Sequence, residues 1–260
     1  MKVTKFDTVH ASDLAKLIPG AEDDKKALQY CADFLTGKLK EGWHVFQGET
    51  DDGKVAQAIM YEPEAGVFKI FAEDTIVIHC IFTPEVAEYE ELCGKLLHYI
   101  EENVEDDYRA IAAVVYTNGS LNPYRFFKLN GYEYAAQDTL ASVVIKRFDP
   151  EVKALTFVPS LPKIYILENR IRVQINYDPS CPATYRAYKK ISEYVRENVA
   201  DEKVFIEEYV IDSDEKYEVY GFPGVFINRM SMPSGPITVE QFDEELKKFL
   251  NNEIPQSPAG

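Results

Sequence analysis

The stretch TIVIHCIFTPEVAEYEELCGKLL, residues 75–97, decides the fold of the first half of the chain. Its first eight residues, TIVIHCIF, are almost all apolar, which is typical of a buried strand. From Pro84 onward, apolar side chains recur at spacings of three and four residues and so predict one face of a helix. These side chains are Val86, Tyr89, Leu92, Cys93, Leu96, Leu97 and Ile100. A buried strand is therefore expected to lead into an amphipathic helix.

The rest of the first half alternates between helical and strand patterns. The turn Asp51-Asp52-Gly53 separates two apolar runs, the first starting at Trp43, and predicts a hairpin. We also expect a helix over 24–39, a buried strand over 109–117, a short helix over 124–132 with Gly131 as its C-cap, and a last strand over 140–148. This order predicts a mixed α/β fold.

Three prolines punctuate the segment FDPEVKALTFVPSLPKIY, residues 148–165, and favour turns. We therefore expect a first domain over 1–150, a linker over 151–164 and a smaller domain over 165–260. The second domain is predicted to contain strands over 171–178, 204–212 and 221–229, a helix over 185–199, an acidic loop, DSDEKYEVY, over 212–220, and a closing helix over 237–250. Thr238 and Gln241 have the spacing of a capping box for that closing helix.

Composition excludes several classes of function. The formal net charge of −16 would repel nucleic acids and anionic membranes, so neither is expected as a partner. No apolar run approaches the ~20 residues that span a bilayer. The N-terminal residues lack the apolar core of a signal peptide, and the four cysteines form no CxxC pair or metal-like cluster. We expect a cytoplasmic protein with reduced thiols and no metal.

The runs VIHCIFTPE (77–85), LCGKLLHYIEE (92–102) and RFFKLNGYE (125–133) resemble the GNAT N-acetyltransferase superfamily over about residues 1–148. Within that superfamily the chain looks like the YoaP-like group, in which a small domain follows the GNAT-like one. The resemblance implies acetyl-CoA as the acetyl donor and a small-molecule or peptide amine as the acceptor. It places the pantetheine arm and the oxyanion against the main chain of Ile81, Phe82 and Thr83. Cys93 and Gly94 would lie beside the cofactor.

The same resemblance suggests candidate acids and bases. Many GNAT enzymes have a tyrosine where this chain has Phe127, so Tyr124, one helical turn away, is the candidate general acid. His79 and Glu73 are candidate bases for the amine by their location. His79 has apolar neighbours, and the alternative is a structural histidine.

The chain departs from the GNAT pattern where a loop with arginine and glycines would hold the pyrophosphate of the cofactor. Here the sequence carries Glu88, Glu90 and Glu91, whose charges would repel phosphate. The alternative is an ordinary helix stabilised by acids in its first turn, with Thr83 as N-cap and Pro84 at the first helical position. Acetyl transfer and a GNAT fold that has lost this activity both stay open.

The segments PSCPAT (179–184) and GFPGVFINR (221–229) look like the thioredoxin superfamily over about residues 165–252. The resemblance implies that Cys181 is a nucleophile at a helix N-terminus, a position that lowers the pKa of a thiol. Pro223 would be the cis-proline that contacts a thiol-containing ligand, and Thr184 takes the place of the resolving cysteine. The alternatives are thiol binding or exchange through Cys181, a buried structural Cys181, and a non-catalytic binding or regulatory protein.

Overall fold

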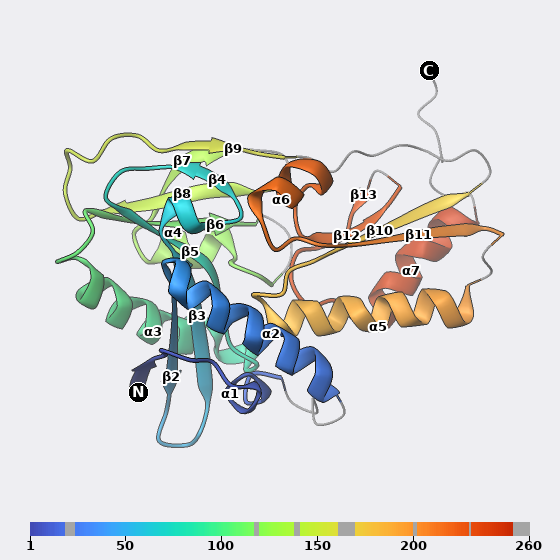
Figure 1. The fold of residues 1–260 in the computed structure, drawn as a ribbon, viewed down its shortest axis with the longest axis horizontal. Coiled ribbons are helices and arrows are strands. Elements are labelled where there is room, and N and C mark those ends of the chain that lie inside the picture. Colours follow the sequence, from blue (N-terminus) through green and yellow to red (C-terminus); the bar gives the residue numbers. More distant parts are fainter. Residues whose placement is uncertain are drawn as a thin grey trace. The chain divides into compact units, whose positions relative to one another are not determined.

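A computed structural model describes residues 1–18, 24–116, 120–137, 141–160, 170–199, 202–228 and 230–251 (Figure 1). The chain divides into two compact units, Met1–Pro159 and Ser160–Gly260. Within the described ranges, no helix is long and apolar enough to cross a membrane. Each unit is described by itself.

A mixed seven-stranded sheet forms the centre of the first unit. Its strands, in spatial order, are β1 (Lys2–Lys5), β2 (Trp43–Glu49), β3 (Val55–Tyr61), β5 (Thr75–Phe82), β6 (Ala110–Val115), β8 (Ser142–Arg147) and β7 (Glu133–Gln137). Among these described strands, β5 and β6 form the single parallel pair, and the other neighbours are antiparallel. The mixed α/β prediction is therefore confirmed, and so is the hairpin of β2 and β3.

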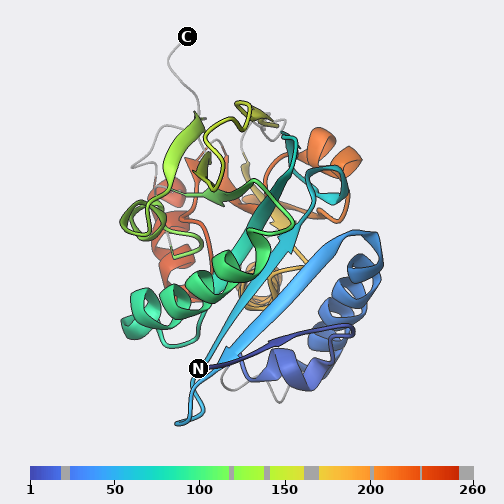
Figure 2. The ribbon, with the colours of Figure 1, turned by 90° about the vertical axis from the view of Figure 1, so that its left-hand side faces the viewer.

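Helices cover both faces of this sheet, as Figure 2 shows for α3 and α2. The helical segments are α1 (Ala11–Ala15), α2 (Lys25–Lys38), η2 (Leu39–Glu41), η3 (Pro63–Ala65), η4 (Val86–Glu88), α3 (Tyr89–Val104) and α4 (Tyr124–Leu129). The apolar face of α3 packs against the sheet through Leu92, Leu96 and Ile100, as its spacing predicts. On the opposite face, Phe34 of α2 makes a T-shaped ring contact with Trp43, with centroids 6.1 Å apart.

An extra residue interrupts β5. Cys80 pairs with Ile59 of β3 and Ile78 pairs with Met60, so His79 between them has no opposite residue and forms a bulge. The parallel ladder between β5 and β6 ends at Ile78, although β5 continues to Phe82. The carboxyl ends of the two parallel strands are therefore unpaired with each other.

Two expectations for the first unit are corrected. The central helix does not begin at Thr83 and Pro84: α3 begins at Tyr89 after the single turn η4. The Thr83 hydroxyl instead donates to the carbonyl of Val55 at 2.7 Å, which holds this residue against β3. The segment expected as a linker contains β9 (Thr156–Val158), which pairs with β4 (Lys69–Phe71) in a separate two-stranded sheet.

In its described residues, the second unit contains a four-stranded sheet and three helices. Its strands, in spatial order, are β11 (Val204–Val210), β10 (Ile171–Tyr177), β12 (Gly224–Ile227) and β13 (Met230–Ser231). β10 and β11 are parallel, whereas β12 and β13 are antiparallel to their neighbours. The helices α5 (Pro182–Asn198) and α7 (Val239–Leu250) lie together on one side of this sheet, and α6 (Asp214–Tyr220) lies on the other (Figure 1).

Most of the acidic segment 212–220 forms the helix α6, Asp214–Tyr220, and not the expected loop. Ser213 is the N-cap of α6, and its hydroxyl accepts from the Lys216 amide at 3.3 Å. Asp214 and Glu215 occupy the first turn, where negative charge stabilises the positive end of the helix dipole. The acids of the expected loop are therefore favourable for helix formation in this position.

The capping box of α7 is confirmed and provides a stability test. The Thr238 hydroxyl accepts from the Gln241 amide at 3.2 Å, and the Gln241 side chain accepts from the Thr238 amide at 2.9 Å. We expect Thr238→Ala to lower the free energy of unfolding by about 1 kcal/mol, because an amide of the first turn loses its partner. Chemical denaturation measures the loss. Glu244→Ala, at an exposed position on the same helix, is the control. Equal stability of the two variants would contradict a role for the cap.

Candidate functional site

A pocket of about 560 Å³ lies beyond the carboxyl ends of β5 and β6. One wall is η4 and the first turn of α3, including Tyr89 and Glu90. The other wall comes from residues that lie after β6 in the sequence and includes Pro123, Arg125 and Phe126. The pocket therefore coincides with the place where the resemblance puts the pyrophosphate of the cofactor.

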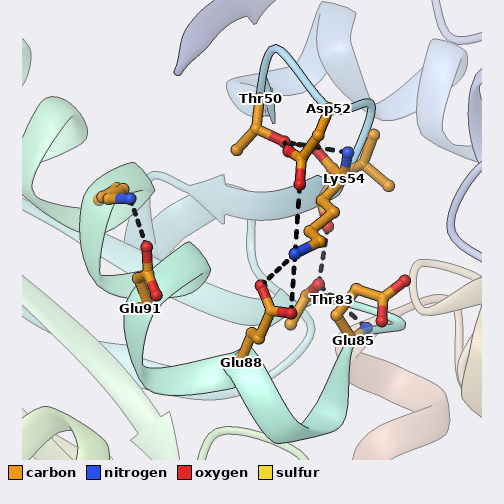
Figure 3. Close-up of polar contacts among 9 residues, drawn as sticks. Thr50, Asp52, Lys54, Thr83, Glu85, Glu88 and Glu91 are labelled. Atoms are coloured by element: carbon orange, nitrogen blue, oxygen red, sulfur yellow. Dashed lines mark hydrogen bonds and ion pairs between the residues drawn. The ribbon is translucent and has the colours of Figure 1, made fainter.

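Each of the three acids predicted here has a cationic neighbour. The Lys54 ammonium, from the end of the β2–β3 hairpin, lies 2.8 Å from the Glu88 carboxylate and 3.2 Å from Asp52 (Figure 3). The hydrogen bond to Glu88, with that to Asp52, raises the pKa of Lys54 to about 12.

The other two acids form more exposed pairs. Glu91 lies 2.6 Å from the Lys95 ammonium, and this hydrogen bond lowers the pKa of Glu91. Glu90 lies 3.7 Å from Arg125, and the side chains are 59% and 81% exposed respectively. Exposed pairs of this kind are weak, so Arg125 is available to other anions. The acidic wall of the pocket is therefore largely compensated, which composition alone did not indicate.

The main chain of Ile81 is bonded to two side chains. Its amide donates to Oδ1 of Asn122 at 2.8 Å, and its carbonyl accepts from the Tyr89 hydroxyl at 2.9 Å. The Asn122 amide group also donates to the carbonyls of His79, at 2.8 Å, and Val114, at 2.7 Å. Asn122 therefore bridges the diverging ends of β5 and β6.

The other residues predicted to hold the cofactor lie near this bridge or on α3. Phe82 is half-buried and pairs with Gln57 of β3. Cys93 is buried in the core, and burial raises the pKa of its thiol, which keeps it protonated. Gly94 has open space beside it, since a Cβ there would meet no atom within 4 Å. Their contact with a cofactor stays a prediction.

The candidate acid and bases lie in different surroundings. His79 is buried and stacks on Phe68, with ring centroids 5.3 Å apart, beside Trp43 and Tyr61. Tyr124 is half-buried and stacks on Tyr134 at 4.3 Å. Glu73 is exposed and pairs with Lys153 at 2.7 Å. Aromatic packing accounts for the position of His79.

In the second unit, Cys181 is the residue before α5 and its Sγ lies 3.1 Å from Oγ1 of Thr184. Each of the two residues is only 2% exposed. The Ser180 amide donates to the Asp178 carboxylate at 2.9 Å, which shapes the turn that leads to Cys181. Cys181 and Thr184 are close together as expected, but both residues are buried below the surface.

The expectation of a cis-proline at Pro223 is corrected, because no described peptide bond is cis. Hydrogen bonds from the side chain of Asn176, in β10, hold the turn before β12. The Asn176 amide group donates to the carbonyls of Tyr220 and Phe222, both at 2.8 Å, and Gly221 takes a φ of 84°. These contacts bring the chain into β12 with Pro223 in the trans form.

Sequence reasoning missed Asn122, Lys54 and Arg125. Asn122-Pro123 is a turn signal, and it could have marked the start of α4. Nothing in the sequence shows that the Asn122 side chain enters the sheet, because its partners lie eight to 43 residues away. Within the described residues, no group of histidine, cysteine, aspartate or glutamate side chains could hold a metal ion.

Comparisons with known proteins give weak likenesses. No family model matches the sequence, and no curated protein matches it significantly. Among solved structures, the aminoglycoside 6′-N-acetyltransferase from Enterococcus faecium aligns with 58% of this chain and 99% of its own, at 14% identity and a TM-score of 0.40. The PaiA N-acetyltransferase from Thermoplasma acidophilum, in complex with coenzyme A, aligns with 56% and 99%, at 12% identity and a TM-score of 0.41. TM-scores at this level assign neither a fold nor a function.

Gly94 allows a direct test of local geometry. We expect Gly94→Ala to raise the free energy of unfolding by about 0.5–1 kcal/mol, because glycine inside a helix costs conformational entropy and the new methyl group meets no atom. Gly37→Ala in α2, where a Cβ also has open space, is the matched control. Thermal or chemical unfolding measures both. A destabilised Gly94→Ala beside a stabilised Gly37→Ala would show that another part of the chain occupies this space.

Proposed function

We propose that the first unit is a GNAT-type N-acetyltransferase that binds acetyl-CoA and acetylates a small-molecule or peptide amine. The observation that carries the proposal is the position of the pocket, at the diverging carboxyl ends of β5 and β6 and beside the start of α3. The crevice outside the carboxyl ends of parallel strands is the usual ligand site of open α/β sheets. Motifs in residues 77–133 that resemble this superfamily lead to the same proposal.

The pocket offers interactions for the phosphates of the cofactor. The 16-residue helix α3 points its N-terminus at the pocket, and its dipole favours negative charge there. Arg125, whose pairing with Glu90 is weak, supplies a guanidinium that matches phosphate oxygens. Lys54 and Lys95 offset Glu88 and Glu91. Binding against this wall would be weaker than at a basic loop.

Acetyl-CoA would supply an activated thioester that an amine can attack. Main-chain amides at Ile81–Thr83 are our candidates for holding the oxyanion, and Tyr124 is our candidate for protonating the leaving thiolate. A second, smaller unit after the first supports the likeness to the YoaP-like group.

Calorimetry with acetyl-CoA tests the proposal. We expect binding to the full chain with a dissociation constant below ~1 mM. Glu90→Gln should tighten binding about two- to fivefold at low ionic strength, because it removes a charge at the pocket and frees Arg125. Glu102→Gln, on the same helix and absent from the pocket lining, is the control. Absence of heat at millimolar acetyl-CoA would reject the function.

A second candidate function belongs to the second unit. We propose that this unit is thioredoxin-like and that Cys181 binds or exchanges with a thiol-containing ligand. The strand order β11-β10-β12-β13, with β10 and β11 parallel and the rest antiparallel, supports that fold. The start of the 17-residue helix α5 favours a thiolate at Cys181, and the Thr184 hydroxyl can donate to it.

Alkylation rates of the four cysteines test this candidate. All four cysteine side chains are buried, so burial alone predicts similar protection. We expect Cys181 to react with iodoacetamide fastest, because the helix N-terminus and Thr184 stabilise its thiolate, and Cys93 to react slowly. Peptide mass mapping of the folded protein measures this, with Thr184→Val expected to slow Cys181 selectively. Alkylation of Cys181 no faster than that of Cys31, Cys80 and Cys93 would contradict the candidate.

A further inference from the structure

Near the end of β5, the main-chain groups of Ile81 are placed like those of a strand residue that pairs with an added strand. Ile81 lies beyond the last residue of β5 that pairs with β6. Both of its main-chain groups nevertheless have partners, and both partners are side chains: Asn122 receives the amide hydrogen and Tyr89 donates to the carbonyl. These are the two groups that a strand residue exchanges with an added extended chain.

The carboxamide of Asn122 has the chemistry of a peptide amide. It has one acceptor oxygen and two donor hydrogens, and three hydrogen bonds of 2.7–2.8 Å use them. The side chain is completely buried between the two strands. It therefore occupies the gap as an amide of an extended ligand would.

The backbone conformation and hydrogen bonds of Asn122 and its described neighbours keep this side chain in place. Asn122 has a φ of 42°, in the left-handed region that most residues avoid. Its carbonyl accepts from the Tyr116 amide at 3.2 Å, and the Tyr124 amide donates to the Tyr116 carbonyl at 3.3 Å. The next residue, Pro123, lines the pocket, so the plug and the pocket wall belong to one segment of chain.

We propose that Asn122 is an autoinhibitory plug, which must leave the β5–β6 gap before the amide-bearing arm of acyl-CoA can pair with Ile81. The inference rests on the proposed function, because it concerns the same site. It goes further because it assigns a closed state to the chain. In this state the phosphate pocket is accessible, but the Asn122 side chain occupies the place of the arm. When the arm binds, an amide of the ligand would replace the Asn122 amide beside Ile81. The Tyr89 hydroxyl would either keep its bond to the Ile81 carbonyl or move away with Asn122.

The test uses the full chain, pantetheine as the arm without its nucleotide, and Asn122→Gly. Glycine tolerates the left-handed backbone, so this variant removes the plug and preserves the turn. Asn228→Gly is the matched control: Asn228 has a φ of 51°, is buried, and accepts from a strand amide, that of Arg172, in the second unit. We expect calorimetry to show pantetheine binding at least about tenfold tighter to Asn122→Gly than to the unmodified chain and to Asn228→Gly, since the plug no longer competes.

A measurement on the unmodified chain serves where Asn122→Gly does not fold. In NMR spectra, the Asn122 side-chain amide hydrogens should exchange slowly in the free protein and faster at saturating pantetheine or acetyl-CoA. Continued slow exchange in the saturated complex overturns the plug, as does pantetheine binding by Asn122→Gly that is equal to or weaker than that of the control. Failure of both the folded variant and the unmodified chain to bind pantetheine also overturns it.

The outcomes separate the plug from the proposed function. If the unmodified chain binds acetyl-CoA and Asn122→Gly binds pantetheine no more tightly than the unmodified chain does, the function is upheld and the plug is rejected. Pantetheine binding by Asn122→Gly, with no acetyl-CoA binding by the unmodified chain, upholds the plug and rejects the function of the native chain.

Discussion

The divergence of β5 from β6 is the constraint on which the first unit depends. A parallel pair inside an otherwise antiparallel sheet must be connected by a crossover, here α3, and so the carboxyl ends of both strands lie at the same edge. The ladder ends at Ile78, the residue before the bulge at His79, and leaves strand groups that need partners in a buried place. One asparagine side chain satisfies groups from both strands. The pocket, the start of α3 and the loop before α4 are all arranged around that edge.

The charges at this edge combine segments that are distant in sequence. Glu88 follows β5, whereas its partner Lys54 comes from the hairpin of β2 and β3. Arg125 belongs to α4 and faces Glu90 at the start of α3. The segment with Glu88, Glu90 and Glu91 is acidic when taken alone. The complete site, which adds cations from the β2–β3 hairpin and α4, is closer to electrically neutral. Phosphate binding is thus compatible with the three glutamates Glu88, Glu90 and Glu91 when the cations stay in place.

The second unit shows a related contrast between pattern and burial. Its strand order and its helix after Cys181 suit thiol chemistry, because they place a cysteine at the positive end of a long helix. Burial of Cys181 and Thr184 opposes that chemistry, since a thiolate nucleophile must meet its partner. The trans form of Pro223 removes a further element of the expected site. Local opening of the turn before α5 would reconcile the two.

Sequence alone predicted the mixed α/β class and many of the helices and strands. Periodicity of 3.6, turn signals and local caps are properties of neighbouring residues, and so α3, α5, the β2–β3 hairpin and the Thr238 capping box could be predicted. Only the tertiary structure decided the start of α3, the pairing of β4 with β9, and the contacts of Asn122. Thr83 bonds Val55 instead of capping a helix, and Asn122 reaches strands up to 43 residues away. Hydrogen bonds between distant segments leave no local pattern, because their geometry exists only once the sheet has formed.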